Sequence, residues 1–156
     1  MGGKQGSNFY VNEYTKQEAS MKWFKWIGIM SALLLIVSCF TPWVYIAMGN
    51  ITVSGIDSTG TSFGKPGLLH FILSGIYILF MLVPKIWTKR ANLLVCAFNL
   101  GWSIRNFIII SACYMGECPQ KKSGLYLIVI ASSLMLLASF FPDMKLKEEE
   151  EEASKK

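Results

Sequence analysis

The chain has 156 residues, of which 53% are hydrophobic and only 16% are charged, and its formal net charge is +5. Ordinary soluble domains carry roughly 25% charged residues, so this composition argues against a soluble protein and favours one of the lipid bilayer. The basic residues flank apolar segments and form no basic helix face, so they indicate membrane orientation and not nucleic-acid binding.

Polar residues 1–21 form a predicted cytoplasmic tail and precede a region, 22–143, that contains four apolar segments. Each segment is close to the roughly 20 residues that a helix needs to cross a hydrocarbon core of about 30 Å. The sequence therefore predicts an all-α membrane protein, an antiparallel four-helix transmembrane bundle with spans at about 26–47, 68–84, 91–113 and 125–142. A charged tail, 144–156, follows the last span.

The longest predicted loop, 49–67, contains a strand pattern followed by turn-forming residues. Ile51 and Val53 alternate with Thr52 and Ser54, and several Gly, Ser and Thr residues come next. Alternation of this kind is typical of a short strand, and the residues after it favour turns. We expect a small extracytoplasmic loop cap that contains a short strand or a hairpin.

The basic residues are unevenly divided between the two predicted sides of the membrane. Eleven of the fifteen lie in the two tails, at the start of the first span and in the loop between the second and third spans. Three others, Lys65, Lys121 and Lys122, lie in the remaining two loops. Because cytoplasmic loops are enriched in Lys and Arg, both termini are predicted to be cytoplasmic.

The first apolar segment imitates a bacterial lipoprotein signal, with Ile36, Val37 and Ser38 before Cys39. Basic residues precede it, as they do in a signal peptide. However, the apolar run continues beyond Cys39, and cleavage there would leave three spans and place the basic C-terminus on the opposite side. The sequence favours an uncleaved signal-anchor helix, with lipidation of Cys39 as the alternative.

Two of the predicted spans carry polar or small residues at seven-residue intervals, the spacing of packing seams in left-handed helix bundles. Small residues let helices approach closely, and Asn and Ser side chains can hydrogen-bond between helices. In the third span the repeat consists of Asn92, Asn99, Asn106 and Cys113. In the fourth span it consists of Gly124, Ala131 and Ala138, beside Ser132 and Ser139.

Arg105 lies within the third predicted span, where a charge costs about 2.5–3.5 kcal/mol on insertion scales. No Asp or Glu lies within any predicted span, so no ion pair between spans is available. The guanidinium could tie a loop to the bundle through Asp57, Glu117 or carbonyls near Pro42. It could instead bind an anion or a lipid headgroup, or simply extend toward the interface.

A binding site at this position would include residues near Arg105 on the third span and at the start of the second. His70, the only histidine, is interpreted as a hydrogen-bonded interface residue that could also line an outward-facing pocket. The binding candidates are therefore Arg105, Asn106, Asn99, Trp102 and His70.

Cys113 and Cys118 bracket a short segment in which Gly116 permits a sharp turn. The turn could bring their Cα atoms to the roughly 5.5 Å that a disulfide requires, and an oxidising compartment would favour the bond. We therefore predict a disulfide, with free thiols as the alternative. A zinc site with His70 has no convincing fourth ligand, so no metal or cofactor is predicted.

The cysteines also raise the alternative of a thiol–quinone redox protein, because such enzymes can have four spans. They use a CxxC-type pair and relay cysteines, whereas Cys39 and Cys96 lie within predicted spans and no CxxC motif occurs. No nucleophile–base pair, carboxylate dyad or glycine-rich phosphate loop is visible either. The sequence therefore predicts a protein that is not an enzyme.

The stretches "FTPWV", "SGIDSTGTSFGKPG", "PKIWTKR" and "RNFIIISACYMGECPQKKSGLYL" resemble a family of small four-span membrane proteins from Bacteroidota. The resemblance covers roughly residues 22–147. It implies a bacterial inner membrane and the topology described above, and it supplies no activity and no catalytic residues.

These observations lead to one expected function and two alternatives. We expect a non-enzymatic integral membrane protein that acts as a small accessory or scaffold subunit, in contact with the lipid bilayer and with a membrane protein partner or a second copy. The first alternative is a binding or transport component for an anionic lipid headgroup or small anion, centred on Arg105. The second is redox chemistry at Cys113 and Cys118.

Overall fold

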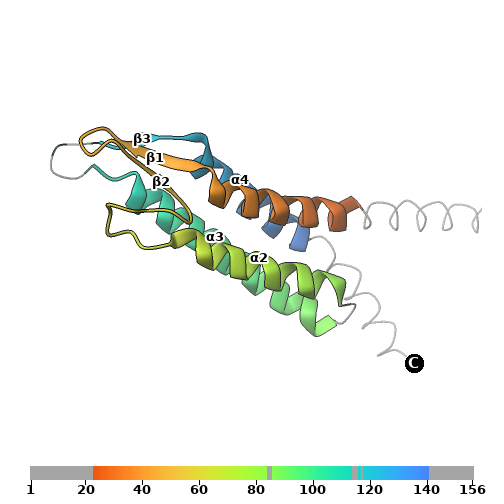
Figure 1. The fold of residues 1–156 in the computed structure, drawn as a ribbon. Coiled ribbons are helices and arrows are strands. Elements are labelled where there is room, and N and C mark those ends of the chain that lie inside the picture. Colours follow the sequence, from red (N-terminus) through yellow and green to blue (C-terminus); the bar gives the residue numbers. More distant parts are fainter. Residues whose placement is uncertain (1–22, 84–85, 114–115, 117, 141–156) are drawn as a thin grey trace, which may run out of the picture.

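The computed structural model describes residues 23–83, 86–113, 116 and 118–140. Within them, four helices lie side by side and a small sheet lies at one end of the helices (Figure 1). The helices are an N-terminal helix (Trp23–Phe40), α2 (Pro66–Leu82), α3 (Ile86–Ile110) and α4 (Ser123–Phe140). The strands are β1 (Pro42–Ile46), β2 (Ile51–Ser54) and β3 (Gln120–Lys121). The predicted tails 1–21 and 144–156 lie outside the described residues.

Three of the helices have the length and composition of membrane-spanning helices. The N-terminal helix, α3 and α4 each contain an apolar stretch of at least 18 residues, whereas α2 is apolar but only 17 residues long. Large apolar side chains cover the outside of the helices, including Leu79 (62% exposed) and Leu94 (72% exposed). Such a surface suits a hydrocarbon environment, so the fold is that of a largely helical protein inserted in a membrane.

The first predicted span, 26–47, is not one helix, because the N-terminal helix ends at Phe40 and β1 begins at Pro42. Proline has no backbone N–H and disfavours helical geometry in the residue before it, so it ends this helix and does not merely kink it. The Thr41 hydroxyl donates a hydrogen bond of 2.8 Å to the Ser38 carbonyl and closes the last turn. The aromatic and β-branched residues after Pro42 favour the strand.

The third predicted span is also shifted along the chain. The helix α3 begins at Ile86 and not near position 91, so Lys89 and Arg90 are helical and do not form a loop. It ends at Ile110, and Cys113 follows it as irregular chain. The second and fourth helices begin two residues before their predicted starts, at Pro66 and Ser123.

The sheet has the strand order β2-β1-β3, with both pairs antiparallel. In the hairpin of β1 and β2, Tyr45 lies opposite Thr52, and on the other edge of β1 it lies opposite Gln120. Asn50 ends the hairpin turn with a φ of 52°, a conformation that asparagine tolerates. The strand predicted from Ile51 is therefore present as β2, whereas β1 and β3 were not predicted.

Trp43 joins this sheet to the helices. Its side chain is fully buried, and its indole N–H donates to the Ser38 carbonyl at the end of the N-terminal helix (2.8 Å). Its own carbonyl accepts the backbone N–H of Lys122, immediately before α4 (2.8 Å). Gly124 and Gly55 make room for it, because a Cβ at either position would come within 2.7 Å of the indole ring. The sheet is thus held directly on the ends of two helices.

The helix α3 packs against both α2 and α4. The N-terminal helix packs against α2 and α4, because a Cβ at Gly28 would meet Tyr77 and Ala138. At the start of α2, the Gly67 N–H donates to the Gly55 carbonyl at 2.7 Å, which ties the loop after β2 to the helix. Successive helices run in opposite directions, so the packing is that of an antiparallel bundle.

Candidate functional site

Polar side chains converge in the interior of the bundle, and we call this group the polar seam. Each of them is at most 6% exposed. They recur at helical spacing, so α2, α3 and α4 each turn one polar row toward a neighbouring helix. The seam consists of His70, Ser74 and Tyr77 of α2, Asn92, Asn99, Ser103 and Asn106 of α3, and Ser132 and Ser139 of α4.

A hydrogen bond between His70 and Asn99 joins α2 to α3 at a distance of 2.6 Å. The amide oxygen of Asn99 can only accept, so His70 donates from Nδ1 and leaves Nε2 as an acceptor. The amide nitrogen of Asn99 in turn points to the sulfur of Met135 in α4, 3.8 Å away. The edge of Trp43 packs against the imidazole, with ring centroids 6.3 Å apart. One small cluster therefore links three helices and the sheet.

A second set of polar contacts joins α3 to α4. The hydroxyls of Ser103 and Ser132 are 2.5 Å apart, and Ser103 is also 3.1 Å from the Asn99 carbonyl. Nearer the other end of the bundle, the Cys96 thiol donates to the Ser139 hydroxyl at 3.7 Å. The predicted seven-residue repeat of asparagines is therefore an interior packing seam, apart from its last member, Cys113, which lies beyond the helix.

Several buried atoms of the seam have no partner among the described residues: Nε2 of His70, the hydroxyls of Ser74 and Tyr77, Oδ1 of Asn92 and Nδ2 of Asn106. Tyr77 and Asn92 each lie one heptad from the bonded pair of His70 and Asn99 along their helices, and the Tyr77 hydroxyl lies beside Gly28 of the N-terminal helix. The seam keeps hydrogen-bonding capacity inside an otherwise apolar bundle.

Arg105 lies outside this seam, on the exposed surface of α3. Its guanidinium carbon is 4.8 Å from the ring centroid of Trp102, whose indole N–H donates to the Pro66 carbonyl (3.1 Å). The five residues that the sequence grouped as binding candidates therefore separate into two sets. His70, Asn99 and Asn106 are interior, whereas Trp102 and Arg105 lie toward the outside of the helix.

Asp57, one of the loop partners considered for Arg105, is bonded within its own loop. The Asp57 carboxylate accepts hydrogen bonds from the hydroxyl (2.5 Å) and the backbone N–H (3.1 Å) of Thr59. These bonds, with a smaller contribution from the Lys65 charge, hold the pKa of Asp57 below its ordinary value. The other predicted acidic partner, Glu117, lies outside the described residues.

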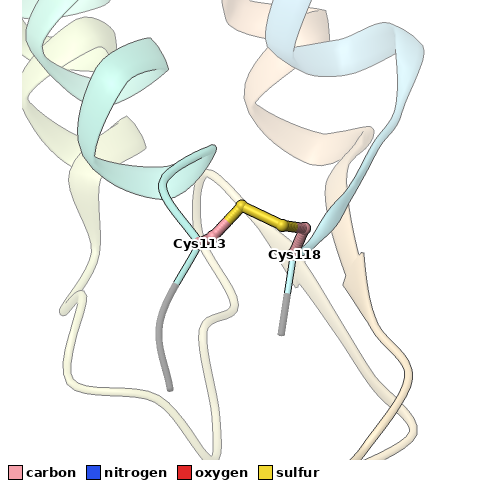
Figure 2. Close-up of a disulfide and its surroundings, with 2 residues drawn as sticks. All are labelled: Cys113 and Cys118. Carbon is pink, nitrogen blue, oxygen red and sulfur yellow. A yellow bond between two sulfur atoms is a disulfide. The ribbon is translucent and has the colours of Figure 1, made fainter. Parts of the chain in front are cut away.

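Cys113 and Cys118 form a disulfide, as predicted, with an S–S distance of 2.01 Å and Cα atoms 4.2 Å apart (Figure 2). The bond connects the chain leaving α3 to the chain entering β3. The other cysteines, Cys39 and Cys96, are free and fully buried. Among the described residues there is no group of three His, Cys, Asp or Glu side chains that could hold a metal ion.

The surroundings of Cys39 bear on the lipidation alternative. Its thiol donates to the Leu35 carbonyl (3.3 Å) and lies 3.7 Å from the Gly67 carbonyl at the start of α2. Lipoprotein cleavage before Cys39 would remove nearly all of the N-terminal helix, which packs against α2 and α4. The packing therefore favours the uncleaved helix.

An apolar hollow of about 610 Å³ lies at the sheet end of the molecule. Its walls come from the hairpin, the loop after β2, the end of α3 and the segment closed by the disulfide. Lining residues include Ile46, Phe63, Ile109, Ile110, Cys113 and Pro119. Sequence analysis missed this hollow because its residues come from four separate segments. Phe63, a lone aromatic in a Gly, Ser and Thr-rich loop, was the one signal that pointed to it.

The fold and the polar seam together define the class of protein. It is a small helical membrane protein with a sheet packed on one end of the bundle. The chain matches no protein-family model, no curated protein and no solved structure.

Because His70 and Asn99 are hydrogen-bonded, substitutions at the two positions should have non-additive effects on the free energy of unfolding. We expect a double-mutant cycle of His70→Phe and Asn99→Leu to give a coupling free energy of about 0.6–1.7 kcal/mol, the range for hydrogen bonds between membrane helices. The measurement is the free energy of unfolding in a mixed-detergent titration. A control cycle of His70→Phe with Asn106→Leu should show coupling below about 0.5 kcal/mol. Equal coupling in the two cycles would contradict this assignment.

Because Arg105 is exposed, replacing it should change the free energy of unfolding only slightly. Arg105→Leu loses a cation–aromatic contact worth about 0.5–1 kcal/mol and makes the helix surface more apolar. We expect the free energy of unfolding in detergent to stay within about 1 kcal/mol of wild type for both Arg105→Leu and Arg105→Lys. Breaking a buried ion pair would cost about 3–5 kcal/mol, so a loss of that size would show that the guanidinium ties a loop to the bundle.

Proposed function

We propose that the chain is a non-enzymatic, four-span membrane protein that acts as a small accessory or scaffold subunit. The fourth span is α2, which at 17 residues reaches the lower limit for crossing a bilayer. It is about 26 Å long and lies among three longer helices. A span that is slightly too short can be accommodated by local thinning of the bilayer. The membrane that we propose is a bacterial inner membrane, which is what the resemblance noted in the sequence would imply.

The charge distribution and the disulfide support an orientation with the sheet outside and both termini in the cytoplasm. The sheet end carries Lys65, Lys121 and Lys122, whereas Lys25, Lys89 and Arg90 lie toward the other end of the described helices. The sequence assigns eight further basic residues to that second side. The disulfide is at the sheet end as well, and disulfides persist in oxidising compartments such as the bacterial periplasm. Two independent features thus favour the same side for the sheet.

The apolar hollow is the observation that carries the accessory role. It is open, lies beyond the end of α3 and is bordered by the sheet and the disulfide, so its shape is held by strands and a covalent bond. A hollow of this size outside the hydrocarbon core fits an apolar side chain of a partner protein, the kind of anchor on which interfaces depend. The partner is a membrane protein or a second copy of this chain.

A second candidate is a binding or transport component for an anion or a lipid headgroup at Arg105. Its exposed guanidinium beside Trp102 favours contact with a headgroup from the surrounding bilayer. Redox chemistry at Cys113 and Cys118 is a weaker candidate, since the other two cysteines are fully buried.

The orientation predicts which introduced cysteines react with a membrane-impermeant reagent added from outside. Thr59→Cys and Gln120→Cys, both at exposed positions, should be labelled in intact cells. Thr88→Cys and Ser154→Cys should be labelled only after permeabilisation. Ser58 is unsuitable because it is buried in the loop. Labelling at position 88 from outside would contradict the four-span orientation.

The accessory role predicts a stoichiometric protein complex. Purified in a mild detergent and weighed by native mass spectrometry, the wild-type chain should carry the added mass of a partner or a second copy. Ala112→Trp places an indole in the hollow and should remove that mass. Ile108→Trp, on the exposed side of α3 and outside the hollow, is the matched control and should retain it. A wild-type chain that is always a bare monomer would refute the proposal.

A further inference from the structure

A shallow apolar groove of about 230 Å³ lies between α3 and α4 on the outside of the bundle. Ile104 and Phe107 of α3 form one wall, and Tyr126, Val129 and Ile130 of α4 form the other. Ile104 and Ile130 are about half exposed (45% and 52%), so the groove opens onto the surface that faces lipid in a membrane. Its volume is below the roughly 300–1,000 Å³ of ordinary ligand pockets, which favours a thin, flexible chain over a bulky ring.

An aromatic pair bridges the two helices at the sheet end of this groove. The rings of Phe107 and Tyr126 meet edge to face, with centroids 5.6 Å apart. Tyr126 lies in the first turn of α4, the end of that helix nearest the sheet, and is 48% exposed. Aromatic residues at this level suit the boundary between hydrocarbon and headgroups.

A lysine ammonium lies over one ring of this pair, that of Phe107. The Nζ atom of Lys121, in β3, is 5.5 Å from the ring centroid of Phe107, which itself lines the groove. The neighbouring Lys122 places its ammonium 5.8 Å from the ring of Tyr45. Within the described part of the chain neither lysine is paired with a carboxylate, so one end of an apolar groove carries uncompensated positive charge.

We propose that this groove binds one acyl chain of an anionic phospholipid, with the lipid phosphate at Lys121. Lipid acyl chains already surround the groove in a membrane, and the lysine ammonium at the end of the groove favours a negatively charged headgroup. One lysine near a membrane surface attracts acidic lipid with about 1 kcal/mol, or roughly fivefold in affinity. The tyrosine hydroxyl of Tyr126 supplies a further donor for phosphate oxygen.

This site is distinct from the one centred on Arg105. The guanidinium of Arg105 lies over Trp102, whose indole is bonded to the start of α2, whereas the groove lies between α3 and α4. The proposal rests on the insertion of α3 and α4 in a membrane and does not depend on the accessory role. The two can therefore fail separately.

The test compares lipid binding by native mass spectrometry of the full chain in detergent. Chain-matched phosphatidylglycerol and phosphatidylcholine are added in turn to wild type and to Lys121→Gln, Lys65→Gln and Arg105→Gln. We expect wild type to prefer phosphatidylglycerol and Lys121→Gln to lose about fivefold of that preference. Lys65→Gln and Arg105→Gln remove exposed cations at the same end and should retain it.

A second pair of variants tests the groove itself. Ile130→Trp fills it and should reduce binding of both lipids, whereas Leu137→Trp, one heptad further on the same face of α4 and 56% exposed, should not. Melting curves without lipid check that each variant is folded.

Three results would overturn the proposal. The first is an unchanged phosphatidylglycerol preference in Lys121→Gln. The second is a loss confined to Arg105→Gln, which would assign headgroup binding to Arg105. The third is a dimer mass that Ile130→Trp abolishes, which would assign the groove to a second copy of the chain.

Discussion

Polar groups inside an apolar bundle must find partners among themselves, and the bond between His70 and Asn99 is where this constraint acts most strongly. Both side chains are fully buried, and each also contacts a third element, Trp43 of the sheet or Met135 of α4. Sliding α2 by one turn against α3 would leave an imidazole and an amide unpaired in a low-dielectric interior. This pair therefore sets the register of the helices, and the serine pair of Ser103 and Ser132 sets it again between α3 and α4.

The sheet depends on that register because it is built from the ends of the helices. One residue separates the N-terminal helix from β1, and one separates β3 from α4. Trp43 is bonded to both helix ends, and the disulfide links the third helix to the third strand. Movement of any helix along its axis would be transmitted to the sheet, the hollow and the disulfide together.

Much of the fold could be predicted from the sequence because membrane helices and cysteine pairs leave local signals. The apolar segments, the asparagine repeat and the bond between Cys113 and Cys118 are all of this kind. The strand β1 could not be recognised, because Trp43 to Ile46 are as apolar as the helix before them and hydropathy does not distinguish the two structures. The sequence also did not reveal that the Arg105 side chain faces the outside of the bundle. Arg105 is adjacent in sequence to Asn106 and was grouped with it and with Asn99 as one candidate site. Successive residues of a helix lie about 100° apart, so Arg105 faces outward although Asn106 is buried.

The central position of β1 has a consequence for how the chain matures. Its first edge is covered by β2, which leaves the ribosome immediately after it, but its second edge is covered only by β3, which follows two further helices. Until then the hairpin has an unpaired edge of the kind that invites pairing with other chains. The three-stranded sheet can therefore form only after α3 has been synthesised and β3 has reached the end of the bundle where the hairpin lies. A chain truncated before β3 keeps an unpaired edge on β1 and lacks Cys118, so it cannot form the disulfide with Cys113.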